Sequence, residues 1–195
     1  NSEERHTKID QLQEILKKGK SNTQQAEIWR QVGRLWSAEG RCGNDIEAHQ
    51  NALASFEQAI ALNPDFPEAL NNQGNTLADL NRQEESIAAF DTVLQLKSDD
   101  YATWVNRASA FYHFRRYEEA IDSYDQALQL KPDDPEIWRD RGFALNNLGR
   151  YEEAITSYDR ALQIKSDDYQ TWYYRGSALN SLGRHEEAIT SLDKA

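Results

Sequence analysis

Residues 116–134 read RYEEAIDSYDQALQLKPDD, and residues 150–168, which lie 34 positions later, read RYEEAITSYDRALQIKSDD. The same step separates further residues along the chain, namely Trp104, Trp138 and Trp172, then Arg107, Arg141 and Arg175, then Ala120, Ala154 and Ala188. A looser copy begins at Pro67. Self-similarity at a fixed period is the sequence signature of a repeat protein. The chain is therefore predicted to be an array of equivalent units.

Each unit reads as a pair of helices. In the first half, apolar or small residues recur three or four positions apart, as in Trp138, Gly142, Leu145 and Leu148. The second half has the same spacing, in Ala154, Ile155, Tyr158, Ala161 and Leu162. This spacing places such residues on one face of a helix. The sequence therefore predicts two amphipathic helices in every unit, joined by short turns.

Residues at the expected helix ends support this division. Asp134 is a good N-cap, and Pro135 suits the first helical turn. Gly149 and Gly183 supply the left-handed residue that ends a helix, and Asn81 can adopt that conformation at modest cost. Arg115 occupies the matching position in another copy. The turn at Arg115 is therefore predicted either to close differently or to bear strain.

These residues resemble the tetratricopeptide repeat, whose pattern is W-x2-L-G-x2-Y, then A-x3-F, then P. Trp138, Gly142, Ala154 and Tyr158 match it directly, while Arg141 stands in place of the leucine and Leu145 in place of the tyrosine. The resemblance covers residues 26–195. It implies an all-α fold, namely a right-handed α-α superhelical solenoid of helix pairs.

The chain is predicted to divide into six parts. Residues 1–22 form an N-terminal amphipathic helix, either a cap or a degenerate half-repeat. Five repeats follow, over residues 23–66, 67–100, 101–134, 135–168 and 169–195, and the last one is truncated. The first repeat carries a seven-residue insertion in GRCGNDIEAHQN. We expect the insertion to form a longer loop and one extra helical turn, with Asp45 as the helix cap.

Composition excludes several classes of function. With 33 acidic and 22 basic residues, the 195-residue chain has a net charge of −11 and lacks the basic surface of a nucleic-acid or membrane binder. Phosphate-binding and metalloprotease motifs are absent. Cys42 and His49 lie seven positions apart in a polar insertion, and their placement there by structure alone is strongly favoured over a nucleophile pair. We therefore predict a cytoplasmic protein that is not an enzyme and needs no metal or cofactor.

Two sets of periodic residues invite a structural interpretation. The tryptophans are predicted to be buried where helices meet. Arg107, Arg141 and Arg175 are either members of an arginine ladder or ligand contacts. In a ladder, each arginine pairs with a periodic acid such as Asp125 or Asp159.

The resemblance also implies where a partner binds. Tetratricopeptide repeats line a concave groove with the first helix of each repeat, and peptides or partner helices lie in it. Carried over to this sequence, the groove residues are Arg30, Arg34, Asn71, Asn72, Asn75, Asn106, Ser109, Tyr112, His113, Arg139, Phe143, Asn146, Tyr173, Tyr174, Ser177 and Asn180. These positions vary between copies. The cation cluster that clasps a chaperone tail is not reproduced, because Ala102, Val105 and Asn106 stand where cations are expected.

Three functions stay open at this point. The first is a protein-protein interaction scaffold that binds a peptide or partner protein in the groove. The second is a structural, self-assembling solenoid, and the third is a regulatory module of a larger enzyme. The truncated fifth repeat is expected to leave Leu182, Ile189 and Leu192 uncovered and to favour end-to-end self-contact.

Overall fold

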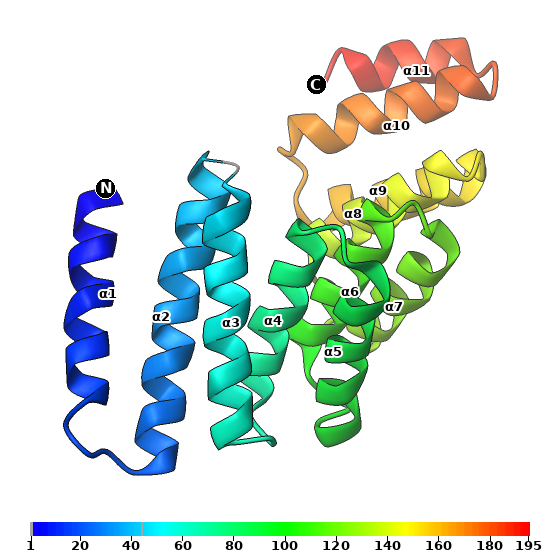
Figure 1. Ribbon diagram of the computed structural model, residues 1–195. Helices are drawn as coiled ribbons and strands as arrows, with labels where there is room; N and C mark the ends of the chain where they lie inside the picture. The colour runs from blue at the N-terminus through cyan, green and yellow to red at the C-terminus, as the bar shows by residue number, and fades with distance from the viewer. Residues whose placement is uncertain (1, 44) are drawn as a thin grey trace. The chain divides into compact units, whose positions relative to one another are not determined.

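A computed structural model describes residues 2–43 and 45–195, and these residues form eleven helices and no strand (Figure 1). They divide into two compact units. Unit 1 ends at Asp100 and contains α1 (Ser2–Leu16), α2 (Asn22–Gly43), α3 (Ile46–Leu62), α4 (Pro67–Asp79) and α5 (Gln83–Leu96). Unit 2 begins at Tyr101 and contains α6 (Tyr101–His113), α7 (Tyr117–Leu130), α8 (Pro135–Asn147), α9 (Tyr151–Ile164), α10 (Tyr169–Ser181) and α11 (His185–Leu192). The predicted all-α fold of helix pairs is confirmed.

The core of unit 1 is built where an aromatic ring of one helix meets a glycine of its partner. The rings of Phe56 and Phe90 are fully buried. A Cβ atom on Gly33 would lie 2.6 Å from the Phe56 ring, and one on Gly74 would lie 2.7 Å from the Phe90 ring. Because glycine has no Cβ, α2 and α4 approach α3 and α5 closely enough to enclose these rings.

Unit 2 repeats this arrangement with tyrosine. The Tyr158 ring is fully buried against Gly142, closer than a Cβ atom at that position would allow. The preceding helix pair has Ala108 at the place of the glycine, and its tyrosine, Tyr124, is buried as well. The helix pair therefore accommodates either glycine or alanine opposite a buried tyrosine.

The periodic tryptophans do not form the core, which corrects the prediction from the sequence. Trp104, Trp138 and Trp172 are only half-buried. The indole Nε1 of Trp138 donates to the carbonyl of Pro132 at 2.8 Å, and that of Trp172 donates to the carbonyl of Ser166 at 2.9 Å. In α8 and α10 this contact ties the start of the helix to the loop before it. The residue of the second helix that faces the glycine of the first is Tyr158 in one pair and Leu192 in the other.

The turn within each later helix pair has one conformation. The residues with positive φ are Asn81 at 57°, Arg115 at 59°, and Gly149 and Gly183 at 74°. The residue that follows each of them donates its amide to a carbonyl five positions earlier, at 2.8–3.0 Å. Arg115 therefore closes the same turn as its counterparts, in a backbone conformation that favours glycine. Of the two predicted outcomes, the structure has the strained one.

The insertion lengthens helices rather than a loop. Helices α2 and α3 have 22 and 17 residues, against 13 and 14 for α4 and α5. Asp45 caps α3 as predicted, because its Oδ1 accepts from the amides of Glu47 and Ala48 at 2.9 and 3.3 Å. Asn44 lies outside the described residues. The expectation of a longer loop was wrong, since Arg41, Cys42 and Gly43 belong to α2.

The predicted N-terminal helix is α1, which packs beside α2. Ile9 is its buried residue. Arg5 donates to Glu39 of α2 at 2.6 Å, and the His6 ring meets the Trp36 ring edge-on at 5.1 Å. Because α1 packs against α2, its residues Lys8 and Leu12 line one side of a groove in unit 1.

Candidate partner-binding face

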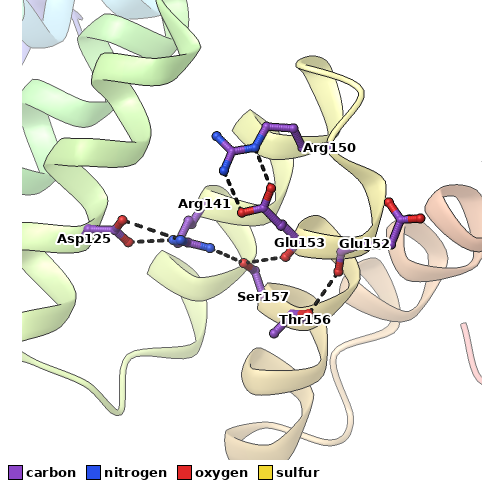
Figure 2. Close-up of polar contacts among 7 residues, drawn as sticks. All are labelled: Asp125, Arg141, Arg150, Glu152, Glu153, Thr156 and Ser157. Atoms are coloured by element: carbon purple, nitrogen blue, oxygen red, sulfur yellow. Dashed lines mark hydrogen bonds and ion pairs between the residues drawn. The ribbon is translucent and has the colours of Figure 1, made fainter.

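An arginine ladder joins consecutive helix pairs of unit 2. Arg141 of α8 donates from Nε to Asp125 of α7 at 2.6 Å, and from Nη1 to Ser157 of α9 at 2.8 Å (Figure 2). Arg175 of α10 makes the same two contacts, with Asp159 at 2.5 Å and Ser191 at 2.6 Å. The ladder hypothesis is thus confirmed at both positions.

The contacts of Arg141 and Arg175 indicate that these arginines have a structural role rather than a role in binding a ligand. The side chains of Arg141 and Arg175 are only 19% and 18% exposed, and a carboxylate and a hydroxyl occupy each guanidinium. Charge-assisted bonds of this kind are stronger than neutral hydrogen bonds. The first helices of unit 2 are therefore held firmly, and their remaining side chains form the available face.

In unit 1, residues of three helices line a groove of about 590 Å³, named here the unit 1 groove. Its lining comprises Lys8, Leu12, Arg30, Gln31, Arg34, Leu35, Ser37, Ala38, Arg41, Asn72 and Asn75. The structure thus brings together Arg30, Arg34, Asn72 and Asn75, as the resemblance implied. The sequence interpretation missed Lys8 and Arg41, because α1 and the extension of α2 have no counterpart in the repeat pattern.

The cations of the unit 1 groove differ in how they are neutralised. Arg30 donates twice to Glu27, at 2.6 and 2.9 Å, and this contact holds the pKa of the Glu27 carboxyl below its usual value. Arg41 lies 3.7 Å from Asp79 and stays 57% exposed. Within residues 2–43 and 45–195, Lys8 and Arg34 make no hydrogen bond or ion pair. Lys8 and Arg34 are thus the groove cations that no direct contact neutralises, although the charge of Arg34 helps to lower the pKa of Glu27.

In unit 2 the expected residues of α8 and α10 form an aromatic cluster. The rings of Phe143 and Tyr174 meet edge-on at 4.3 Å, and those of Tyr173 and Tyr174 meet at 5.4 Å. The Tyr112 hydroxyl of α6 accepts from Asn147 at 3.1 Å. Tyr173 is 55% exposed, so about half of its aromatic side chain is open to solvent.

Arg139 belongs to the same face, but its guanidinium is already occupied. It donates to Asp140 at 3.2 Å and to Asp168 at 3.5 Å, and lies over the Phe143 ring at 5.8 Å. Burial raises the pKa of the Asp140 carboxyl, while Arg139 opposes that rise. The nearby Tyr158 hydroxyl is buried and forms no hydrogen bond with the described residues. This part of the face is polar and tightly packed.

The other expected groove residues lie on the first helices without joining either cluster. Ser109, His113, Ser177 and Asn180 are exposed, whereas Asn71, Asn106 and Asn146 are half-buried. The Asn180 side-chain oxygen lies 3.0 Å from Nδ1 of His185. The role of this set in binding stays a prediction.

The described residues contain no group of three or more His, Cys, Asp and Glu side chains that is able to hold a metal ion. Cys42 is exposed, whereas the His49 ring is buried against Gly40. In the same residues, no helix has the length and apolarity that a membrane crossing requires. At the end of unit 2, Ile189 and Leu192 are 60% and 44% exposed, while Leu182 is half-buried.

Comparison with solved structures gives the fold independently. MamA from Desulfovibrio magneticus RS-1 superposes with a TM-score of 0.77 at 18% identity, over 87% of this chain and 92% of that one. Another crystal structure of MamA superposes with a TM-score of 0.74 at 19% identity, over 87% and 89%. A search of curated proteins gave no match. Likeness at this level of identity concerns the fold alone.

The family profile described as tetratricopeptide repeat matches four overlapping stretches, residues 48–101, 95–135, 105–169 and 144–195. Together these stretches span most of the chain, and they fall on the helix pairs described above. Proteins of this kind are typically interaction scaffolds without catalytic activity. By sequence and by fold, the chain belongs to the tetratricopeptide-repeat family.

Proposed function

We propose that this protein is an interaction scaffold that binds a peptide or a partner protein along the first helices of its repeats. The observation that carries the proposal is the unit 1 groove, where Lys8 and Arg34 stand unpaired beside the amides of Asn72 and Asn75. The exposed Tyr173 ring adds a second contact surface in unit 2. Unpaired cations and exposed tyrosines are typical of binding sites, since a partner completes their interactions.

The repeat boundaries are part of the proposal. Five repeats, over residues 23–66, 67–100, 101–134, 135–168 and 169–195, present one first helix each to the partner, and residues 1–22 flank the first repeat. The residues that pack the helix pairs recur with the repeat, whereas those on the proposed face differ from copy to copy. A face that varies on a constant scaffold suits the recognition of one particular partner.

A capture experiment with matched variants tests the proposal. The groove variant combines Arg34→Ala with Tyr173→Ala, and the control combines Gln126→Ala with Gln163→Ala, on exposed positions of second helices. Proteins captured from cells that make this protein are compared among wild type, groove variant and control, after circular dichroism shows equal helicity. We expect the groove variant alone to lose its partner.

Equal capture by all three proteins would refute binding through the first helices and direct attention to the second helices or to the insertion. A mass that rises with concentration in the absence of any partner, through Ile189 and Leu192, would instead favour the self-assembling solenoid.

A further inference from the structure

We propose that the unit 1 groove binds an acidic segment of a partner protein, whose carboxylate side chains pair with Lys8 and Arg34 while its apolar side chains rest on Leu12 and Leu35. This inference rests on the proposed scaffold function and names the chemistry of the partner at one site. It concerns side-chain carboxylates within a segment, not a free chain end.

Charge distinguishes this groove from the rest of the molecule. The chain has a net charge of −11, yet the groove is lined by four cations, Lys8, Arg30, Arg34 and Arg41, and by no acidic residue. A local potential opposite to the overall charge concentrates ligands of the complementary sign. Because the chain as a whole is acidic, an acidic partner is attracted more strongly to this groove than to an average part of the surface.

The cations are also available. Lys8 and Arg34 make no hydrogen bond or ion pair in the described part of the chain, and Arg41 is held only loosely, 3.7 Å from Asp79. Arg30, by contrast, is committed to Glu27 through two bonds. The groove therefore offers two free charges from two different helices, α1 and α2. Two charges on different helices fit a segment with several carboxylates better than a single small anion.

The remaining lining indicates a peptide rather than a small anion. Leu12 and Leu35 are half-buried and contribute apolar surface to the lining of the groove. The side-chain amides of Asn72 and Asn75 make no hydrogen bond with the described residues, so they are free to bind a peptide backbone. A volume of about 590 Å³ is that of a site for a ligand of many atoms. An amphipathic acidic segment satisfies all three features.

The probe for the test is a fluorescein-labelled peptide in which leucines alternate with glutamates and aspartates, with both ends blocked. Its binding to the full chain is measured by fluorescence anisotropy at two salt concentrations. The variant is Lys8→Gln with Arg34→Gln, and the control, Lys17→Gln with Arg150→Gln, removes the same charge from pairs outside the groove. We expect the groove variant to bind roughly ten-fold more weakly, the control to bind like wild type, and added salt to weaken wild-type binding.

A charge reversal sharpens the test. Lys8→Glu with Arg34→Glu is expected to abolish binding of the acidic peptide and to create binding of the matched peptide that carries lysine in place of each acid. Circular dichroism establishes that each variant folds. A reversed preference cannot arise from a fold defect, because a damaged groove would lose both ligands.

Several results would overturn the proposal. They are the absence of probe binding to the wild type, equal binding by the groove variant, binding only when the peptide's terminal carboxylate is unblocked, and tighter, variant-sensitive binding of a single-stranded oligonucleotide. If the probe fails while capture of a natural partner still depends on Arg34 and Tyr173, the scaffold function stands and only the acidic chemistry is wrong. If capture is also independent of these residues, the scaffold function fails with it.

Discussion

Removing one rung of the arginine ladder is expected to cost far more stability than removing a neighbouring arginine on the surface. Arg141→Ala deletes the bond to Asp125 at 2.6 Å and the bond to Ser157 at 2.8 Å. Asp125 is 42% exposed and regains water, so its share is about 1 kcal/mol, and the bond to the buried Ser157 adds about 1 kcal/mol. The guanidinium 5.9 Å from the Trp138 ring adds about 0.5 kcal/mol. The expected loss is roughly 2–3 kcal/mol.

The matched control is Arg150→Ala. Arg150 pairs with Glu153 at 2.6 Å, but both side chains are about half exposed and the pair spans only one turn of α9 (Figure 2). Urea denaturation followed by the helical circular-dichroism signal compares the two variants with wild type. We expect Arg141→Ala to lower the transition midpoint clearly and Arg150→Ala to leave it within error.

A double-mutant cycle isolates the rung itself. Asp125→Asn combined with Arg141→Ala removes both partners, and the coupling between them is expected to be about 1 kcal/mol. If Arg141→Ala destabilises no more than Arg150→Ala, or if the coupling is zero, then the ladder contributes nothing to stability. The recurrence of these arginines would then need another cause.

Three further changes test the packing, the turns and the half-buried carboxyl of Asp140. Tyr158→Ala is expected to cost about 3–5 kcal/mol by urea denaturation, and Trp138→Ala about half of that, because Tyr158 is fully buried and Trp138 only partly; equal losses would contradict the assignment of the core. Arg115→Gly is expected to stabilise by about 0.5–1 kcal/mol, since it relieves a φ of 59°, and a destabilised protein would show that the arginine side chain matters more than the strain. Burial raises the pKa of Asp140, so the charged carboxylate destabilises the folded protein at neutral pH, and this effect fades as the pH falls through that pKa. Asp140→Asn is therefore expected to raise the melting temperature at pH 7. At about pH 3 the carboxyl of the wild type and the amide of the variant are both neutral, so no rise is expected there.

The sequence predicted the helices well because each has a local cause. The three- and four-residue spacing defines the buried face, Asp134 and Asp45 cap helices, and glycine ends two of them. The partner of Arg141 was also predictable from the sequence, because Asp125 lies 16 positions before it and the same interval separates Arg175 from Asp159. The serine on the other side, Ser157, recurs 16 positions after the arginine, and that signal was missed.

The predictions from the sequence were wrong where the burial of a side chain depends on three-dimensional packing, which residue spacing alone does not determine. Trp138 has the period of a core residue, yet its ring lies at the helix start, where it binds a loop carbonyl. The insertion was expected to form a loop because it is polar, but an extended helix exposes polar residues equally well. The groove in unit 1 depends on α1, whose position beside α2 no repeat pattern encodes. Sequence reasoning therefore named four of the residues that line this groove, Arg30, Arg34, Asn72 and Asn75, and none of those on α1.

The ladder has a consequence for how such a chain changes in length. In unit 2, the segment from residue 135 to 168 carries an arginine, Arg141, that binds Asp125 of the segment before it, and a carboxylate, Asp159, that binds Arg175 of the segment after it. A duplicated segment arrives with both halves of this joint in the right places. Inserting or deleting a whole segment therefore leaves each ladder arginine next to a carboxylate, and no new contact has to evolve. An insertion or deletion of another length moves the arginine away from its carboxylate. Recombination in the gene is expected to be tolerated at that one interval.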